Sequence, residues 1–271
     1  MRGLSDKIAV VTGGGAGIGG AITQRLIAEG AVVVVLDISA PPNDFAPGER
    51  APALWIVCDV SDSASVDAAF SRLAEDLGPI DILINNAGAI GLEHLRRVTP
   101  LLARQRAEID AGQVPTTPLD ALVRMTDDEW HRMLAIHLDG TFFCTRAAVR
   151  TMAPRQSGVV INMASICGLE GCSGHPHYSA AKGAVLAFTK SVAKELIVQG
   201  IRVNAVAPGH VGTNALQGEI SEQRAAIARS TPAGRLARPD EVAATVAFLA
   251  SEDAAYYIGA VLSPNGGLVM A

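Results

Sequence analysis

The sequence has few charged residues, few aromatic side chains and no long uninterrupted apolar run. Charged residues make up 18% of the 271 positions and aromatic residues 4%. The formal net charge of -5 offers no basic surface for nucleic acid or for an anionic membrane. No apolar run approaches the ~18–20 residues that a bilayer-spanning helix needs. We therefore expect a globular protein that has neither nucleic acid nor a membrane as a partner.

Cysteines are also few, and their spacing matches no common metal site. Cys58, Cys144, Cys167 and Cys172 are scattered, and no second pair complements the last two. The spacing therefore predicts buried or loop thiols and no metal. Residues 1–7 lack the apolar stretch of a secretory signal and lead straight into a strand. Together these features predict a reduced, cytoplasmic protein.

Short apolar runs alternate with helical patterns along the whole chain. The sequence is 49% hydrophobic, which suits a large sheet whose strands are buried on both faces. Strand–helix alternation predicts a parallel sheet, and no repeat or linker divides the chain. We predict one doubly wound α/β domain, residues 1–271, with helices on both faces of about seven strands, at 7–11, 31–37, 54–60, 80–84, 159–161, 201–206 and 260–262.

A glycine-rich turn follows the first predicted strand and opens a helix that runs to Ala28. Its glycines include Gly13, Gly17 and Gly19. Glycines let the backbone approach a pyrophosphate, and the helix start offers free N–H groups. The alternative is a glycine turn without a ligand. The strand–turn–helix context favours dinucleotide binding.

The second predicted strand ends in an acid, Asp37, which lies 24 residues after Gly13. A carboxylate at this place can accept hydrogen bonds from the adenosine ribose hydroxyls, and it repels a 2′-phosphate. No Lys or Arg stands at 14–16 or 38–39 to bind such a phosphate. The pattern favours NAD over NADP. The alternative is that Asp37 only caps the next turn.

Ser165, Tyr178 and Lys182 form a candidate acid/base group. Tyr178 and Lys182 are four residues apart, so on a helix they share one face. A lysine ammonium favours the phenolate form and lowers the tyrosine pKa from its usual value near 10. A strand-end serine can meet that tyrosine across a cleft, and the tyrosine then serves as a general acid or base for an alcohol or carbonyl. The alternative is a surface lysine lying along a ring.

Taken together, the motifs identify the chain as similar to the short-chain dehydrogenase/reductase family over nearly its whole length. The resemblance implies a Rossmann-type fold and hydride transfer at NAD. The matching residues are Thr12-Gly13-x-x-x-Gly17-Ile18-Gly19, Asp59-Val60, Asn85-Asn86-Ala87-Gly88, Ser165, Tyr178-x-x-x-Lys182, 202–209 (RVNAVAPG) and Gly266-Gly267.

The resemblance also implies a role for each matching residue. Ser165 would hydrogen-bond the substrate oxygen, Tyr178 would exchange a proton with it, and Lys182 would bind the nicotinamide ribose. Asp59 and Val60 would flank the adenine. Together with Tyr178 and Lys182, the cofactor-binding residues would be Gly13, Gly17, Ile18, Gly19, Asp37, Asp59, Val60, Asn86, Ala87, Gly88, Pro208, Gly209, Val211 and Thr213.

Two segments are expected to shape the substrate cleft: an insertion that the family pattern lacks and a lid. Residues 90–125 form an insertion near the substrate cleft, where Pro100 to Ala111 is predicted as a helix with Leu101, Leu102 and Ile109 on its apolar side. The arginines of the insertion suggest a site for an anionic substrate tail such as CoA phosphates. A solvated face or a subunit contact is the alternative. Residues 213–231 are predicted to form a lid over the substrate. The four arginines that suggest the anion site lie within residues 91–118 and are Arg96, Arg97, Arg104 and Arg106.

Single residues also depart from the pattern. His137 stands where the family usually has an asparagine that holds a water linked to the catalytic lysine. We expect His137 to keep a relay through water, because a neutral imidazole donates and accepts; the alternative is a packing role. His175 and His177, just before Tyr178, are expected in a surface loop; the alternative is that either contacts substrate. Asn265 replaces an acid that often precedes the terminal Gly-Gly.

We therefore predict an oxidoreductase that transfers a hydride between NAD(H) and a secondary alcohol or ketone, either a 3-hydroxyacyl thioester or a hydroxysteroid. The resemblance implies a homotetramer. One alternative is an NADP-dependent 3-oxoacyl reductase, against which Asp37 argues. Another is a catalytically silent NAD-binding sensor or scaffold, against which the intact Ser165, Tyr178 and Lys182 argue.

Overall fold

A parallel sheet of seven strands forms the centre of the protein. The computed structural model describes residues 1–42, 51–213 and 221–270. The strand order is β3-β2-β1-β4-β5-β6-β7, and every neighbouring pair runs parallel. This confirms the predicted fold class. The strands are β1 (Ile8–Thr12), β2 (Val32–Asp37), β3 (Leu54–Val57), β4 (Ile82–Asn85), β5 (Gly158–Met163), β6 (Ile201–Val206) and β7 (Val261–Leu262).

The strand order reverses beside β1, which lies between β2 and β4. In register, Ala9 lies opposite both Val33 of β2 and Ile82 of β4. The chain winds outward in one direction through β2 and β3 and in the other through β4 to β7. Such a reversal leaves a crevice at the carboxyl ends of the strands, where ligands bind in open α/β sheets.

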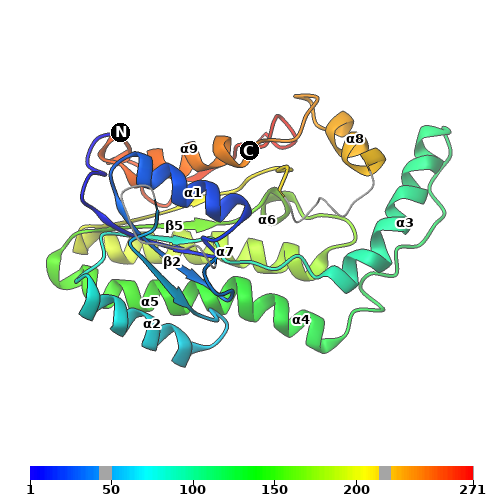
Figure 1. Ribbon diagram of the computed structural model, residues 1–271. Coiled ribbons are helices and arrows are strands. Elements are labelled where there is room, and N and C mark those ends of the chain that lie inside the picture. The colour runs from blue at the N-terminus through cyan, green and yellow to red at the C-terminus, as the bar shows by residue number, and fades with distance from the viewer. Residues whose placement is uncertain (43–50, 214–220, 271) are drawn as a thin grey trace.

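Helices cover both faces of the sheet (Figure 1). One face carries α1 (Gly17–Ala28) and α9 (Pro239–Ala250), whose apolar residues pack with Ala9 and Val11 of β1. The other face carries α2 (Ser63–Asp76), α5 (Gly140–Met152) and α7 (Pro176–Leu196), and Val10 and Val34 belong to that core. Successive strand residues therefore enter opposite cores, as the near-continuous apolar runs predict.

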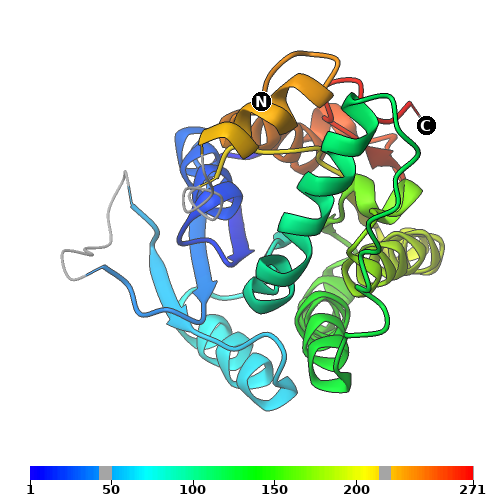
Figure 2. The same ribbon diagram turned by 90° about the vertical axis from the view of Figure 1, so that its right-hand side faces the viewer.

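The remaining elements are the helices and helical turns that connect the strands and the covering helices. Figure 2 views the protein from the side on which α3 crosses the front. No helix of the described residues is long and apolar enough to span a membrane. These elements are α3 (Leu92–Asp110), α4 (Asp127–Leu134), the π-helical turn η1 (Ala135–Asp139), α6 (Ile166–Glu170), α8 (Ser221–Ser230), η2 (Ala153–Arg155), η3 (Ile197–Gln199) and η5 (Glu252–Ala254).

The helix of the insertion is longer than predicted. It begins at Leu92 rather than Pro100, and Pro100 lies inside it. An interior proline has no N–H to donate, so one backbone carbonyl of the helix lacks its usual partner. Pro100 lies on the exposed side of α3, where that carbonyl can bond to water. The predicted apolar side is wrong for Ile109, which is exposed, while Leu101 and Leu102 are half-buried. The fully buried residues of α3 are His94 and Val98.

Three of the four arginines within residues 91–118 form ion pairs. Arg97 contacts Glu129 of α4 at 2.7 Å, while Arg104 and Arg106 pair with acids one turn along α3. These contacts weigh against a shared anion site. For the predicted lid, residues 214–220 lie outside the described residues and 221–230 form α8, so its closing role stays a prediction.

Two smaller boundaries also differ from the predictions. The third strand ends at Val57 rather than at residue 60. A serine ahead of a helical pattern predicts Ser61 as the N-cap of the helix that follows, but Asp62 holds that place. The Asp62 carboxylate accepts from the Ala64 amide at 3.0 Å. Both differences are shifts of one to three residues at the ends of elements, where the local sequence determines the boundary least.

Candidate active site

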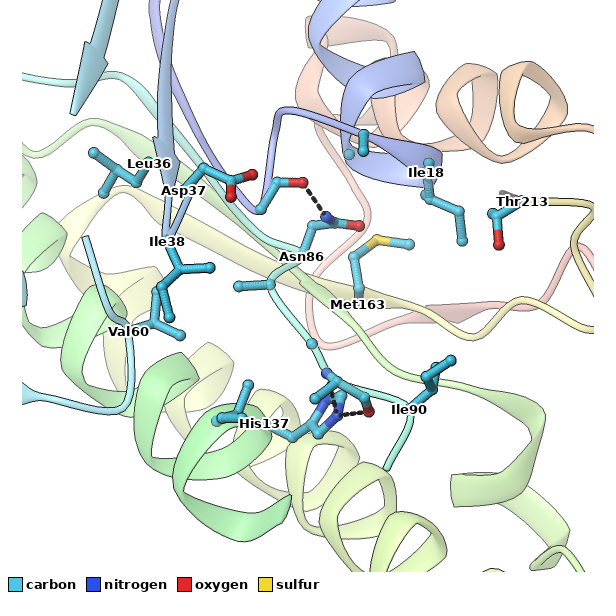
Figure 3. A pocket seen from close by; sticks show the side chains of 18 of the residues that line it. Ile18, Leu36, Asp37, Ile38, Val60, Asn86, Ile90, His137, Met163 and Thr213 are labelled. Atoms are coloured by element: carbon cyan, nitrogen blue, oxygen red, sulfur yellow. Dashed lines mark hydrogen bonds between the residues drawn. The ribbon is translucent and has the colours of Figure 1, made fainter. Parts of the chain in front are cut away.

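A cavity of about 500 Å³ opens at the carboxyl ends of the strands, beside the reversal of strand order. In Figure 3, Asp37, Asn86 and Met163 face this space, with His137 below them and Thr213 at the far side. Ser165, Gly209 and Val211 are not among its lining residues. The predicted residues that line it are Gly13, Gly17, Ile18, Gly19, Asp37, Asp59, Val60, Asn86, Ala87, Gly88, His137, Tyr178, Lys182, Pro208 and Thr213.

The glycine turn leaves no room for side chains where it meets the start of α1. Gly13 has φ +60, and a Cβ at this position would lie 2.9 Å from the Cα of Ala87. A Cβ on Gly19 would overlap the carbonyl oxygen of Gly13. The N-cap residue Ala16 offers no side-chain cap. The first N–H groups of α1 are therefore available to an anion.

A second turn, residues 85–88, is locked against the glycine turn. The Thr12 hydroxyl accepts from the amides of Asn86 and Ala87 at 3.0 and 2.9 Å. The Asn86 side chain donates to the carbonyls of Thr12 and Gly13, both at 3.1 Å. These four bonds hold the two turns at fixed distance along one wall of the cavity.

Asp37 stands at the end of β2, as predicted, and its carboxylate is held by two backbone amides. Gly15 donates to one oxygen at 3.1 Å and Ser39 to the other at 3.0 Å. The basic side chains that line the cavity within the described residues are Arg132 and Lys182. Lys182 lies at the opposite side, beside Tyr178, so the Asp37 end carries negative charge.

Asp59 and Val60 form the floor at the predicted adenine position. The Asp59 carboxylate accepts from both the amide and the hydroxyl of Ser61, at 2.9 and 2.7 Å. Val60 packs against Gly140, where a Cβ would lie 2.9 Å from its side chain. A backbone turn and a glycine contact thus fix both residues in the lining.

Ser165, Tyr178 and Lys182 come together as the spacing predicts. Tyr178 and Lys182 share one face of α7, with the ammonium 5.8 Å from the centre of the tyrosine ring. The buried Lys182 ammonium donates to the Met163 carbonyl at 2.6 Å. Ser165 caps α6 and accepts from the Cys167 amide at 3.2 Å.

Burial dominates the ionisation of this group. It raises the pKa of Tyr178 above its usual value, and a hydrogen bond from Ser165 opposes that rise. Burial also lowers the pKa of Lys182 to about 7. The direction for Tyr178 is opposite to the one predicted from its spacing to Lys182, because desolvation disfavours both charged forms.

His137 lies in the π-helical turn η1, edge-on to the Tyr178 ring at 5.4 Å. Its Nε2 atom is 3.1 Å from the amide nitrogen and 2.9 Å from the carbonyl oxygen of Ala89. Its buried Nδ1 atom has no partner among the described residues. Burial lowers the pKa of His137 to about 3, so the ring is neutral near pH 7.

The nicotinamide side is only partly lined as predicted. Pro208 and Thr213 face the cavity. Gly209 instead packs on Asn265, where a Cβ would lie 2.9 Å from the Asn265 backbone. Asn265 is buried and bonds to Ser263, Gly267 and Val269, so it holds the C-terminal turn.

The thiol prediction is wrong for two of the four cysteines. Cys167 and Cys172 form a disulfide, while Cys58 and Cys144 are free and buried. The Cys167 amide bonds to Ser165, and the Cys172 amide donates to the Ser179 hydroxyl at 3.0 Å. The bridge therefore joins the segment after Ser165 to the start of the Tyr178 helix.

The surface-loop prediction is also wrong for His177. His177 is the second residue of α7 and is 1% exposed. Its ring centre lies 4.4 Å from that of buried His94, and His175 lies 5.6 Å from His94. Among the described residues no His, Cys, Asp or Glu group is arranged to hold a metal ion.

Several lining residues carried no signal in the sequence. Arg132 of α4 and the backbone at Ala89 and Ile90 line the cavity, and Met163 contributes the carbonyl that receives Lys182. Arg132 lies in a polar helix whose acids Asp127 and Asp128 are exposed, whereas Glu129 is half-buried. Only the fold reveals which charged residues of this helix face a cavity.

Comparison with known proteins agrees with the geometry. The family model described as short chain dehydrogenase matches residues 7–224. A cis-4-hydroxycyclohexanecarboxylate dehydrogenase of Sinomonas cyclohexanicum is 39% identical over 268 residues, covering 97% of each chain. The 3-oxoacyl-[acyl-carrier-protein] reductase FabG of Vibrio harveyi is 36% identical, covering 98% of this chain and 99% of its own. The corresponding Escherichia coli K12 protein is 35% identical at the same coverage.

The family match spans most of the sheet, the glycine turn, and Ser165, Tyr178 and Lys182. The similarity to the three relatives covers 97–98% of the chain. Fold, cavity and sequence similarity thus lead to one conclusion: the chain belongs to the short-chain dehydrogenase family.

Proposed function

We propose that the protein catalyses the reversible, NAD(H)-linked oxidation of a secondary alcohol to a ketone. The observation that carries the proposal is a single cavity lined by an acid at one end and an acid/base pair at the other. Asp37 lies at the ribose end, and Tyr178 and Lys182 lie at the reacting end. Glycine turns bound the space between them.

The residues present fit NAD. Gly13, Gly17 and Gly19 line the cavity at the uncapped start of α1, so a pyrophosphate can approach the backbone there. The Asp37 carboxylate can accept from ribose hydroxyls, and it would repel a 2′-phosphate. When bound, NAD supplies the hydride acceptor, and the protein supplies position and proton transfer.

Tyr178 is the residue that moves the proton. With its pKa raised by burial, the phenol is protonated at neutral pH and can donate directly to a ketone oxygen. Alcohol oxidation needs the phenolate, so its rate should rise with pH. Ser165 would hold the substrate oxygen by a hydrogen bond. Lys182 would bind the nicotinamide ribose, and its charge would favour the phenolate form of Tyr178. His137 would keep a water-linked contact to Lys182.

Ring alcohols are the substrates that we propose to test first. The relative from Sinomonas cyclohexanicum is a dehydrogenase of cis-4-hydroxycyclohexanecarboxylate, whose hydroxyl is a secondary ring alcohol. 3-Hydroxyacyl thioesters and hydroxysteroids, predicted from the sequence, belong in the same panel. Each offers a secondary alcohol, and they differ in the size and charge of the remainder.

Replacing the proposed acid/base tests the function directly. Tyr178→Phe should bind NAD with an unchanged dissociation constant and lose turnover by about 10²–10⁴-fold. Tyr256→Phe, at a 98% exposed tyrosine, is the matched control and should match the wild type. Undiminished turnover in Tyr178→Phe would refute the assigned role. NAD binding without turnover of any panel member by the wild type would favour a sensor or scaffold.

A second candidate is an NADP-dependent 3-oxoacyl reductase. It is favoured by similarity at 35–36% identity to proteins named 3-oxoacyl-[acyl-carrier-protein] reductase. Comparing kcat/KM with NADH and NADPH on one ketone separates the two candidates. We expect NADH to be preferred, and Asp37→Ser to lower that preference. A wild-type preference for NADPH would favour the second candidate.

The homotetramer and the cytoplasmic location remain predictions from the family resemblance and the sequence. Phe142 of α5 is 40% exposed, and its ring lies 6.4 Å from that of Phe188 of α7. Phe188 is half-buried, and an exposed phenylalanine beside it suits a subunit contact. Light scattering coupled to size-exclusion chromatography should give a mass near four chains, whereas a monomer mass would contradict the prediction.

A further inference from the structure

A second cavity of about 500 Å³ adjoins the first. The two share the lining residues Gly88, Ala89, Ile90, Arg132 and Ile136. Beyond this wall the second cavity extends over the start of α3, the inner side of α4 and His177, which immediately precedes Tyr178. A substrate whose hydroxyl reaches Tyr178 therefore has room to place its other end there.

Most of the second cavity is apolar or neutral. Ile90, Leu92, Met133 and Ile136 supply apolar surface. The imidazole of His177 is 1% exposed, and its Nδ1 atom has no partner among the described residues. Burial, together with the neighbouring His94, lowers the pKa of His177 to about 4, so at neutral pH it presents a hydrogen-bonding group without charge.

The charges around this cavity leave one cation without a partner. The Glu129 carboxylate is taken up by Arg97 at 2.7 and 2.8 Å and by the Thr126 amide at 3.1 Å. Glu93 lies exposed in the first turn of α3, where the helix dipole favours its negative charge. Arg132 lines both cavities, and within residues 1–42, 51–213 and 221–270 it forms no ion pair.

We propose that Arg132 binds a carboxylate on the substrate and thereby selects hydroxy acids over neutral alcohols. The ring or chain that joins the carboxylate to the hydroxyl lies against Ile90, Met133 and Ile136. His177 supplies a further hydrogen-bonding group at the same end. This inference rests on the proposed alcohol dehydrogenase function and names its substrate class.

The test compares two substrates that differ only in charge, cis-4-hydroxycyclohexanecarboxylate and its carboxamide. Arg132→Leu should lower kcat/KM for the carboxylate about 10–100-fold, mainly through KM, because a charge-assisted pair is lost. The carboxamide should change less than about threefold. Arg132→Lys should retain part of the selectivity, since it keeps the charge without the planar guanidinium.

Arg124→Leu is the matched control, because Arg124 lies just before α4, pairs with Asp120 and lines neither cavity. It should leave both substrates unchanged. Equal losses for both substrates in Arg132→Leu, or no loss for either, would overturn the carboxylate site while leaving the dehydrogenase function standing.

A binding measurement keeps the inference testable if no alcohol is turned over. Calorimetric titration of the full-length wild type with cyclohexanecarboxylate, in the presence of NAD, should show binding that Arg132→Leu weakens about tenfold or more. Equal affinities for the two proteins would overturn the proposal. Failure of turnover with intact Arg132-dependent binding would count against the proposed function alone.

Discussion

The two sides of the catalytic cavity are built by different kinds of contact. The cofactor side consists of the turns at 12–19 and 85–88, which are joined by backbone bonds and glycine contacts too tight for a Cβ. The substrate side consists of α3, α4 and the paired histidines, and it depends on side chains such as the exposed Arg97–Glu129 ion pair. Substitutions on the cofactor side should therefore strongly reduce cofactor binding. Substitutions on the substrate side should cost little stability, because its side chains can rearrange.

The largest expected effect on cofactor affinity comes from a methyl group on the cofactor side. Gly19→Ala places a Cβ on the carbonyl oxygen of Gly13, so the turn or the start of α1 must move. A displacement of this kind, about 1 Å, can cost 10²-fold. We expect the dissociation constant for NAD, measured by calorimetry, to rise about 100-fold.

Gly20→Ala is the matched control for that change. A Cβ at Gly20 meets its nearest atom at 3.6 Å, an ordinary contact. NAD affinity should stay within about twofold, and the helix should gain about 0.5–1 kcal/mol from the better helix former. Similar losses in the two variants would show that the cofactor side is not specifically intolerant at Gly19.

A second prediction concerns how the stability of the protein depends on pH through the buried residue His137. The pKa of His137 is lowered from 6.5 to about 3, so below pH 6.5 the unfolded chain binds a proton that the folded chain does not. The free energy of unfolding should therefore fall as pH falls from about 6.5 to 3, by up to about 1.4 kcal/mol per pH unit from this residue. Denaturant melts at several pH values measure the slope.

His137→Asn should flatten this acid slope, because asparagine does not titrate. His131→Asn, at an exposed histidine of α4, is the control and should keep the wild-type slope. The pH–rate profile of the variant addresses the predicted water relay. An unchanged profile together with a flattened stability slope would assign His137 to packing against Tyr178 and Ala89.

A third prediction concerns the disulfide on the substrate side. Cys167 and Cys172 close a short loop, and loop-closure entropy gives such a bridge about 2 kcal/mol. Reduction with dithiothreitol should lower the free energy of unfolding by this amount and raise KM for the alcohol more than KM for NAD. Without reductant, Cys172→Ser should have the same free energy of unfolding as the reduced wild type. Adding dithiothreitol should not change it further. A reductant effect retained by that variant would contradict the assignment.

The smallest expected effect comes from the surface of the insertion. Arg97→Gln removes the ion pair that joins α3 to α4, and exposed pairs contribute about 0–1 kcal/mol. Arg106→Gln, which removes a pair within α3 alone, should cost less. Thermal melts at low and high salt measure both. A loss above about 2 kcal/mol for Arg97→Gln would show that the substrate side is as strictly built as the cofactor side.

Much of the cofactor side could be predicted because its contacts are local in sequence. The strand, glycine turn and helix at 8–28 follow one another without interruption, and Asp37 ends the next strand. Tyr178 and Lys182 share a helix face by spacing alone. In each case a short pattern determines which atoms meet, so the sequence contains the answer directly.

The substrate side could not be predicted because its contacts join distant segments. The pairing of His94 with His177 depends on how α3 packs against α7, and no local pattern encodes it. The inner position of Arg132 depends on the rotation of α4 about its axis. The raised pKa of Tyr178 depends on burial by the whole fold, which outweighs the hydrogen bond from Ser165.

The contact between Gly88 and His137 has a consequence for protein engineering. A Cβ on Gly88 would lie 2.5 Å from the Cε1 atom of the His137 ring, so the two positions compete for one volume. A library that varies either position alone samples mostly clashes or voids. The two codons should therefore be randomised together, and a shorter side chain at 137 is what would admit alanine at 88.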